Sequence, residues 1–251
     1  ATEQRLRERL RDLIQAPSPD DIALVKNTSE GLSILAQGLD WQTGDNVVGI
    51  VQEFPSNRLP WEALQDQGVA YRALDLDTTD DPEAALAELC DARTRLIAVS
   101  SVQYARGLRL NLERLGATCR RQGILLCVDA IQSLGALPFD LKRTPVDVVV
   151  ADGHKWMLGP EGIALLYVAP ALRPRLRLRQ FGWHMIAHPG DYDRHDWTPS
   201  PTATRFECGS PNLLGIHALE ASLSLLQEVG MASVASAIEQ RISRLMSLLD
   251  Q

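Results

Sequence analysis

Short, nearly continuous apolar segments recur along the chain and constrain its fold more than any other feature. The clearest of them, residues 146–151, is rich in valine and ends abruptly at Asp152-Gly153-His154-Lys155, and a second apolar run follows at residues 163–168. Runs of this length that are rich in β-branched residues are typical of strands buried on both faces. The pattern therefore predicts a strand that delivers Lys155 to the edge of a sheet, then a turn and a returning strand.

Helical stretches alternate with these apolar runs. We predict further strands at residues 22–25, 46–51, 69–74, 96–101 and 124–129, and helices at residues 1–15, 31–38, 61–67, 82–91, 112–122, 212–229 and 231–249. This alternation predicts an α/β fold of three layers, in which helices cover both faces of a mostly parallel sheet. Ligands bind such sheets beyond the carboxyl ends of the strands, so the candidate functional residues are those that directly follow each strand.

Composition limits the classes of function. A chain of 251 residues is long enough for one large α/β core. Its net charge of −7 argues against a nucleic-acid partner, because phosphate binding favours a basic face. No apolar run of membrane length and no signal peptide is visible, which predicts a cytoplasmic chain without membrane contact. The four cysteines lack the spacing of metal ligands, so we predict a reducing compartment and no metal site.

Lys155 is the first candidate for chemistry. A lysine that is held at a strand end and partly buried is easily made nucleophilic, because burial disfavours its charged form. Schiff-base chemistry with an aldehyde cofactor requires such an amine. A lone lysine after a strand is more often an ordinary solvated loop residue, so the assignment depends on its neighbours.

Three other strand ends carry suitable groups. Thr28 and Ser29, at the start of a helix, offer hydroxyl and backbone N–H groups to a phosphate dianion, although both residue types also serve as plain helix caps. Asp129 could keep a pyridine nitrogen protonated or act as a turn residue. Gln132 could offer its amide to the phenolic oxygen of the same ring or lie on the surface. Phe54 could stack on an aromatic cofactor or belong to the core.

The motifs occur in an order that resembles a known family. Asn27-Thr28-Ser29-Glu30-Gly31, Asp129-Ala130-Ile131-Gln132, Asp152-Gly153-His154-Lys155 and the segment from Arg205 to Asn212 are similar to those of class V aminotransferases. These enzymes depend on pyridoxal 5'-phosphate, have fold type I, and include cysteine desulfurases, selenocysteine lyases and kynureninases. Each motif alone is weak evidence, whereas the ordered set, which spans residues 27–212, is specific.

The resemblance implies a role for each matching residue. Lys155 would form the Schiff base and move the proton at the substrate carbon, while Asp129 would pair with the pyridinium nitrogen and Gln132 would contact the phenolic oxygen. The phosphate would be bound by Thr28, Ser29 and His154. Ser210 would reach the phosphate held by the partner subunit, which implies a homodimer with sites at its interface.

Three positions depart from the family pattern. Phe54 stands where desulfurases carry a ring-stacking histidine, and a phenyl ring stacks but cannot transfer a proton. Tyr104, in Ser101-Val102-Gln103-Tyr104 where the family often has His-Val-Ser-Asn, could offer its hydroxyl to the phenolic oxygen. Asp152 replaces the usual serine near the phosphate, and we exclude it as a phosphate ligand because a second anion there would repel the dianion.

We predict three parts of the chain: a helix and lead-in at residues 1–26, a cofactor-binding large domain at 27–230, and a helix at 231–251 that leads toward a small C-terminal domain absent from this chain. The resemblance places the arginine for the substrate carboxylate in that absent domain. The predicted function is that of a pyridoxal-phosphate-dependent transaminase or lyase, which acts on a small amino-acid substrate through a Schiff base with Lys155.

Two alternatives stay open at this point. One is a cysteine desulfurase or selenocysteine lyase, although none of the four cysteines lies where the resemblance places a persulfide cysteine. The other is a truncated, catalytically idle relative that serves as a structural or dimerisation partner. A nucleotide-binding domain is excluded, because neither GxGxxG nor GxxxxGK[ST] follows any predicted strand.

Overall fold

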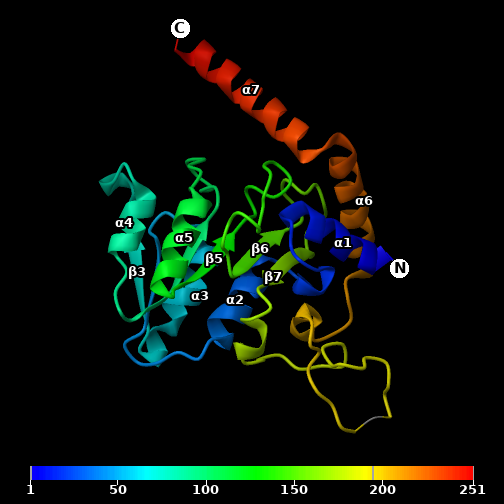
Figure 1. Cartoon of the computed structure of the whole chain (residues 1–251). Coiled ribbons are helices and arrows are strands. Elements are labelled where there is room, and N and C mark those ends of the chain that lie inside the picture. The colour runs from blue at the N-terminus through cyan, green and yellow to red at the C-terminus, as the bar shows by residue number, and fades with distance from the viewer. Residues whose placement is uncertain (1, 194, 251) are drawn as a thin grey trace.

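The computed structural model describes residues 2–193 and 195–250. In this part of the chain seven strands form one sheet in the order β1-β7-β6-β5-β4-β2-β3 (Figure 1). Their bounds are Ile22–Val25 (β1), Asn46–Ile50 (β2), Ala70–Leu74 (β3), Thr94–Ser100 (β4), Leu125–Asp129 (β5), Val148–Asp152 (β6) and Ala164–Val168 (β7). β7 runs antiparallel to both of its neighbours, and the other adjacent strands pair in parallel. The prediction of a mostly parallel sheet is confirmed.

Helices cover both faces of this sheet. The described helices are Thr2–Ile14 (α1), Thr28–Gly38 (α2), Leu59–Glu62 (α3), Pro82–Glu88 (α4), Leu112–Gln122 (α5), Leu213–Val229 (α6) and Met231–Leu249 (α7). One apolar cluster joins buried residues of α1, α4, α5 and α6 to one face of the sheet. A second cluster joins α2 and α3 to the other face. The fold therefore has the three α/β/α layers that the sequence predicted.

Three predicted helices differ from the observed ones by more than one residue at an end. α2 begins at Thr28 rather than at residue 31, because the side chain of Asn27 caps the helix by accepting the backbone N–H of Glu30 at 2.9 Å. The helix predicted at residues 61–67 starts at Leu59 as α3 and continues from Ala63 as a 3₁₀ helix. The helix predicted at residues 82–91 ends at Glu88. The start of α2 matters for function, since Thr28 and Ser29 lie in its first turn.

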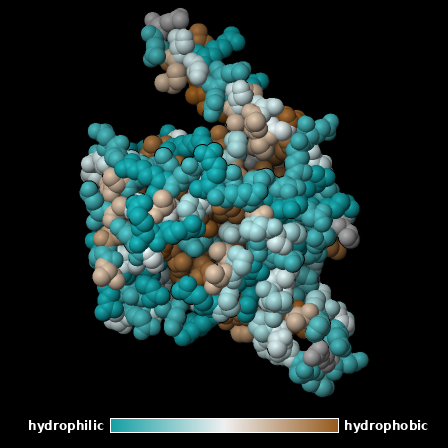
Figure 2. Space-filling view, in the orientation of Figure 1, coloured by the Kyte–Doolittle hydropathy of each residue, from teal (hydrophilic) through white to brown (hydrophobic). Residues whose placement is uncertain are grey.

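α7 leaves the rest of the structure at Gly230 and projects away from the sheet (Figure 1). Apolar and hydrophilic residues both lie on its surface (Figure 2), and Ile242, Leu245, Met246 and Leu249 are each more than half exposed. No single described helix is long and apolar enough to cross a membrane; only α6 and α7 taken together meet that criterion, with a bend of 77° between them. The division of the chain into three parts stays a prediction.

Candidate functional site

The carboxyl ends of neighbouring parallel strands bring polar residues to one edge of the sheet. Asp129, the last residue of β5, lies opposite Ser100 of β4 in the strand register and opposite Val150 of β6 on its other side. Lys155 follows the end of β6 by three residues. Parallel strands that end at the same edge thus place an acid and an amine close together.

Asp129 is almost completely buried, with 2% of its surface exposed. One carboxylate oxygen accepts the backbone N–H of Ile131 at 3.0 Å. Burial raises the pKa of Asp129 to about 7, and the negative charge of Glu53 adds to this effect, while the Ile131 hydrogen bond and the positive charge of Lys155 oppose it. A protonated pyridine nitrogen would supply the counter-charge that this carboxylate lacks.

Phe54, Tyr104 and Lys155 come together at the same edge. The Nζ atom of Lys155 lies 5.8 Å from the centroid of the Phe54 ring. The rings of Phe54 and Tyr104 meet edge to face, with centroids 5.3 Å apart and planes inclined by 80°. Phe54 is 45% exposed, so the alternative that it is a core phenylalanine is wrong. Its ring is available to cover a flat ligand beside Lys155.

The first turn of α2 is fixed against this edge by two hydroxyl groups. The buried Thr28 Oγ1 accepts the backbone N–H of Asp152 at 3.1 Å, which ties α2 to the end of β6. Ser29 Oγ donates to Ser56 Oγ at 2.8 Å, which ties it to the segment after Phe54. Gly31 allows this close packing, because a Cβ atom there would lie 2.6 Å from Val150 Cγ1. The N-terminus of α2 therefore lies beside the turn that carries Lys155.

Asp152 and His154 contact each other within that turn. His154 Nδ1 lies 3.0 Å from Asp152 Oδ1, which forms an ion pair when the imidazole is protonated. The approach is not aligned as a hydrogen bond, and this buried oxygen has no hydrogen-bond donor among the described residues. The contact explains how an aspartate is accommodated at this position: its charge faces the imidazole of His154.

Two predicted site residues are not joined to the others by contacts. Gln132 is half-buried in the turn after β5, and its amide makes no hydrogen bond within the described chain. Ser210 is exposed and borders a pocket of about 440 Å³ that it shares with Lys26, Glu30 and Asn212. The roles of both residues stay predictions, as does the assignment of Ser210 to the site of a partner subunit.

Two buried polar residues near the site were not assigned a role from the sequence. Glu53 accepts hydrogen bonds from both the backbone N–H and the hydroxyl of Ser100, and burial raises its pKa. The side-chain Oε1 atom of Gln103 accepts the backbone N–H groups of Ala105 and Arg106, which shapes the loop that carries Tyr104. Only the position of Glu53 two residues after the predicted strand at residues 46–51 could have indicated its burial.

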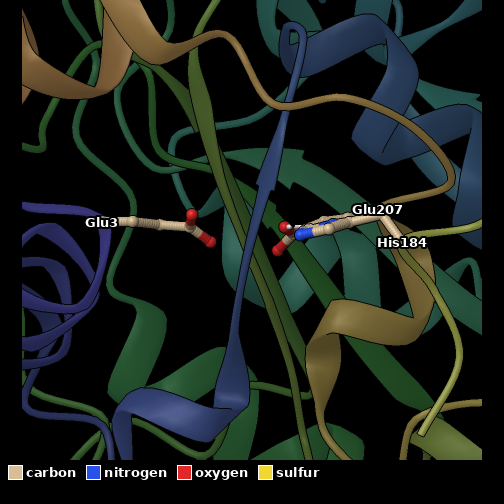
Figure 3. A group of neighbouring side chains, drawn as sticks. All are labelled: Glu3, His184 and Glu207. Atoms are coloured by element: carbon tan, nitrogen blue, oxygen red, sulfur yellow. Dashed lines mark ion pairs between the residues drawn. The ribbon is translucent and has the colours of Figure 1, made fainter. Parts of the chain in front are cut away.

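Glu3, His184 and Glu207 are close enough together to surround a metal ion (Figure 3). Arg7 already occupies this cluster: its guanidinium binds both oxygens of Glu207, at 2.7 and 2.8 Å, and Glu3 at 2.7 Å. A buried arginine that neutralises both carboxylates would compete with any cation. We therefore assign the cluster to an ion-pair network and not to a metal centre.

Comparison with known proteins identifies relatives of the whole chain. The family model described as aminotransferase class-V matches residues 2–251. A probable cysteine desulfurase of Methanothermobacter thermautotrophicus is 31% identical over 233 residues, which cover 92% of this chain and 57% of the relative. The chain thus spans somewhat more than half the length of this curated relative.

Solved structures agree with this result. A variant of C-DES with glycine covalently linked to its PLP cofactor has a TM-score of 0.91 and 29% identity, and the match covers 100% of this chain and 66% of the other. The cystine C-S lyase C-DES in complex with its reaction product, cysteine persulfide, has a TM-score of 0.87 and 30% identity over 96% of this chain and 65% of the other.

Proposed function

This chain belongs to the class V aminotransferase family, and we propose that it forms the cofactor-binding part of a pyridoxal-phosphate-dependent enzyme that acts on an amino-acid substrate through Lys155. The observation that carries the proposal is the position of the Lys155 amine beside the Phe54 ring at the sheet edge where Asp129 is buried. The idle-relative alternative has no corresponding support, because a purely structural domain does not require an acid whose burial raises its pKa to about 7.

The residues present fit this cofactor. Its ring nitrogen becomes cationic when protonated, and Asp129 is a buried carboxylate without a full counter-charge. Its phosphate suits a helix N-terminus with hydroxyl groups, as at Thr28 and Ser29 in the first turn of α2. Its flat ring suits the exposed face of Phe54. The fold of the chain and the location of this edge agree with ligand binding beyond the strand ends.

Each residue then has a distinct task. Pyridoxal phosphate supplies an aldehyde and an electron-withdrawing ring. Lys155 would supply the amine for the aldehyde and would hold or move the proton at the substrate carbon. Asp129 would hold the proton on the ring nitrogen, and Phe54 would cover one face of the ring and exclude water. His154 would bind the phosphate together with the start of α2.

The remaining predicted contacts are part of the same proposal. Tyr104 and Gln132 would donate to the phenolic oxygen of the ring, and Ser210 would bind the phosphate in a partner subunit. This last contact requires a homodimer. We further propose that the enzyme is cytoplasmic and binds a small amino acid, but neither nucleic acid nor membrane. The net charge of −7 agrees with the absence of a nucleic-acid partner.

Carbon–sulfur bond cleavage is the second candidate function. Its support is the names of the relatives, which include a cysteine desulfurase and a cystine lyase observed with cysteine persulfide. Phe54 opposes the desulfurase variant, because a phenyl ring cannot take over proton transfer. The products separate the possibilities. Desulfuration of cysteine yields alanine and transfers the sulfur to an acceptor thiol, whereas elimination from cystine yields pyruvate, ammonia and cysteine persulfide. Transamination yields a 2-oxo acid that retains the side chain.

Borohydride reduction in the presence of pyridoxal phosphate tests the proposal directly. The chain contains three lysines, Lys26, Lys142 and Lys155, so peptide mass spectrometry can locate the reduced adduct without ambiguity. We expect the adduct on Lys155, its loss in Lys155→Ala, and its full retention in Lys142→Ala, whose lysine is exposed in a loop. An adduct distributed over Lys26 and Lys142, or no adduct in a folded chain, contradicts the proposed function.

A further inference from the structure

A pocket of about 390 Å³ lies between α2 and residues 177–180, beside the site described above. Neither Lys155, Asp129 nor Phe54 lines it, although Ser29 of the proposed phosphate site does. Apolar side chains of Ile34, Leu178 and Phe206 contribute to its wall. The charged residues that line it are four cations and one acid, namely Lys26, Arg177, Arg179, Arg205 and Glu30.

Arg205 is the unusual member of this set. Its Nε atom is buried and has no hydrogen-bond acceptor, and no ion pair joins its guanidinium to any described residue. Burial lowers the pKa of Arg205, and the charge of the neighbouring Arg173 lowers it further. Arg173, in contrast, is neutralised by an ion pair with Asp21. A partly buried guanidinium without an acceptor is costly unless an anion compensates it.

The other cations leave the pocket positively charged. Arg179 donates through Nε to the backbone carbonyl of Gln37 at 2.9 Å, which satisfies one donor but leaves its charge unpaired. Arg177 forms an exposed ion pair with Asp40 at 2.7 Å. Lys26 has no ion pair within the described chain, and the carboxylate of Glu30 accepts the backbone N–H of Lys26. Attraction for an anion therefore exceeds the repulsion from Glu30.

We propose that this pocket is an anion-binding site for a small molecule that carries a carboxylate or phosphate group. Arg205 and Arg179 supply planar guanidinium groups that match the oxygens of either anion, and Lys26 adds a point charge. The apolar residues Ile34 and Leu178 contact the remainder of the ligand. The cations that bind the anion have no part in the proposed catalytic function, and the pocket shares only Ser29 and the helix cap Asn27 with the proposed phosphate site.

Isothermal titration calorimetry tests the site with two probes, inorganic phosphate and succinate. The protein is used after treatment with pyridoxal phosphate and borohydride, so that a cofactor phosphate cannot be mistaken for the probe, and the titration is repeated on the untreated chain. We expect saturable binding of at least one probe that weakens at least tenfold in Arg205→Gln. The control Arg114→Gln, which removes an exposed arginine paired with Asp81 outside the pocket, should bind as wild type does. The tighter probe identifies the anion class.

A second variant distinguishes loss of the anion site from misfolding of Arg205→Gln. Arg179 is exposed, so Arg179→Gln should fold normally and also weaken binding. Equal binding by wild type and both variants, or no binding of either probe, overturns the proposal. If Arg205→Gln breaks a dimer that the wild type forms, and neither anion affects that dimer, Arg205 belongs to a subunit contact. This result also overturns the proposal. If no adduct forms on Lys155, wild type and variants can still be compared by titration of the untreated chain. The proposed catalytic function and the proposed anion site can therefore be refuted independently of each other.

Discussion

At the scale of the residue, Asp129 is the group whose ionisation the structure changes most clearly at the candidate site. Two other carboxylates, Glu53 and Asp152, lie near enough to raise its pKa, and Lys155 is the nearby cation that lowers it. Carboxylates collected at one buried edge are unfavourable in the absence of a bound cation. The arrangement is therefore better suited to a site that receives a protonated ring than to a stable core.

This environment makes the stability of the cofactor-free chain depend on pH. The folded-state pKa of Asp129 is about 7, above the ordinary value of 3.8, so between these values the folded chain binds more protons than the unfolded chain. The free energy of unfolding therefore falls as pH rises from about 4 to about 7. Asp129→Asn should flatten this decline, as measured by urea unfolding at pH 5 and pH 7.5.

The exposed Asp66 provides the matched control, because Asp66→Asn removes a carboxylate without a buried environment. It should show the same dependence on pH as wild type. An identical decline in wild type and Asp129→Asn would mean that Asp129 does not titrate in this range.

At the scale of the element, the turn that carries Lys155 is fixed by its neighbour. Gly135, in the turn after β5, has a φ of +96°, and a Cβ atom there would overlap the backbone carbonyl of Trp156. The two turns are thus in backbone contact, so the position of Lys155 depends on the strand order as well as on β6. This coupling predicts that a change in one turn is detected in the other.

Gly135→Ala should destabilise the chain and reduce the yield of the borohydride adduct on Lys155. Gly123→Ala is the matched control, since Gly123 has a φ of +69° but open space around the position of a Cβ atom. The control should lose about 1 kcal/mol of unfolding free energy from the left-handed backbone alone. Gly135→Ala should lose about 1–3 kcal/mol more, from overpacking. Equal losses in urea unfolding would refute the contact between the turns.

At the scale of the whole molecule, the Arg7–Glu207 ion pair joins segments 200 residues apart. Arg7 also donates to the backbone carbonyl of Ile22 at 2.6 Å, and Glu207 accepts the backbone N–H of Leu24 at 2.8 Å. α1, β1 and the segment before α6 are therefore held in one network. Since that segment leads to Ser210, the network also positions the surface proposed to meet a partner subunit.

Arg7→Met should lower the free energy of unfolding by about 3–5 kcal/mol, because it leaves Glu207 buried without its counter-charge. The double variant Arg7→Met, Glu207→Gln should recover part of this loss, since glutamine is uncharged and still accepts the N–H of Leu24. For comparison, Arg114→Met breaks the exposed pair with Asp81 and should cost less than about 1 kcal/mol. A double variant no more stable than Arg7→Met would show that the charge of Glu207 is not the cause.

The sequence by itself determined the strands, most of the helices, the three-layer class and the residues that follow each strand. These depend on local signals: apolar runs predict buried strands, and Asn27, Asp81 and Asn111 each cap the helix that follows them. Lys155 and Asp129 were identifiable for the same reason, since each follows an apolar run within four residues.

Only the tertiary structure decided which of these residues meet. The insertion of antiparallel β7 between β1 and β6, the burial of Glu53 against Ser100, and the contact of Asp152 with His154 all depend on pairings or on a turn geometry that no local pattern encodes. Arg205 illustrates the limit most clearly, because its charge is visible in the sequence but the absence of an acceptor is not. Whether a charge is compensated depends on the groups that surround it in the folded structure, and those groups come from segments that are distant in the chain.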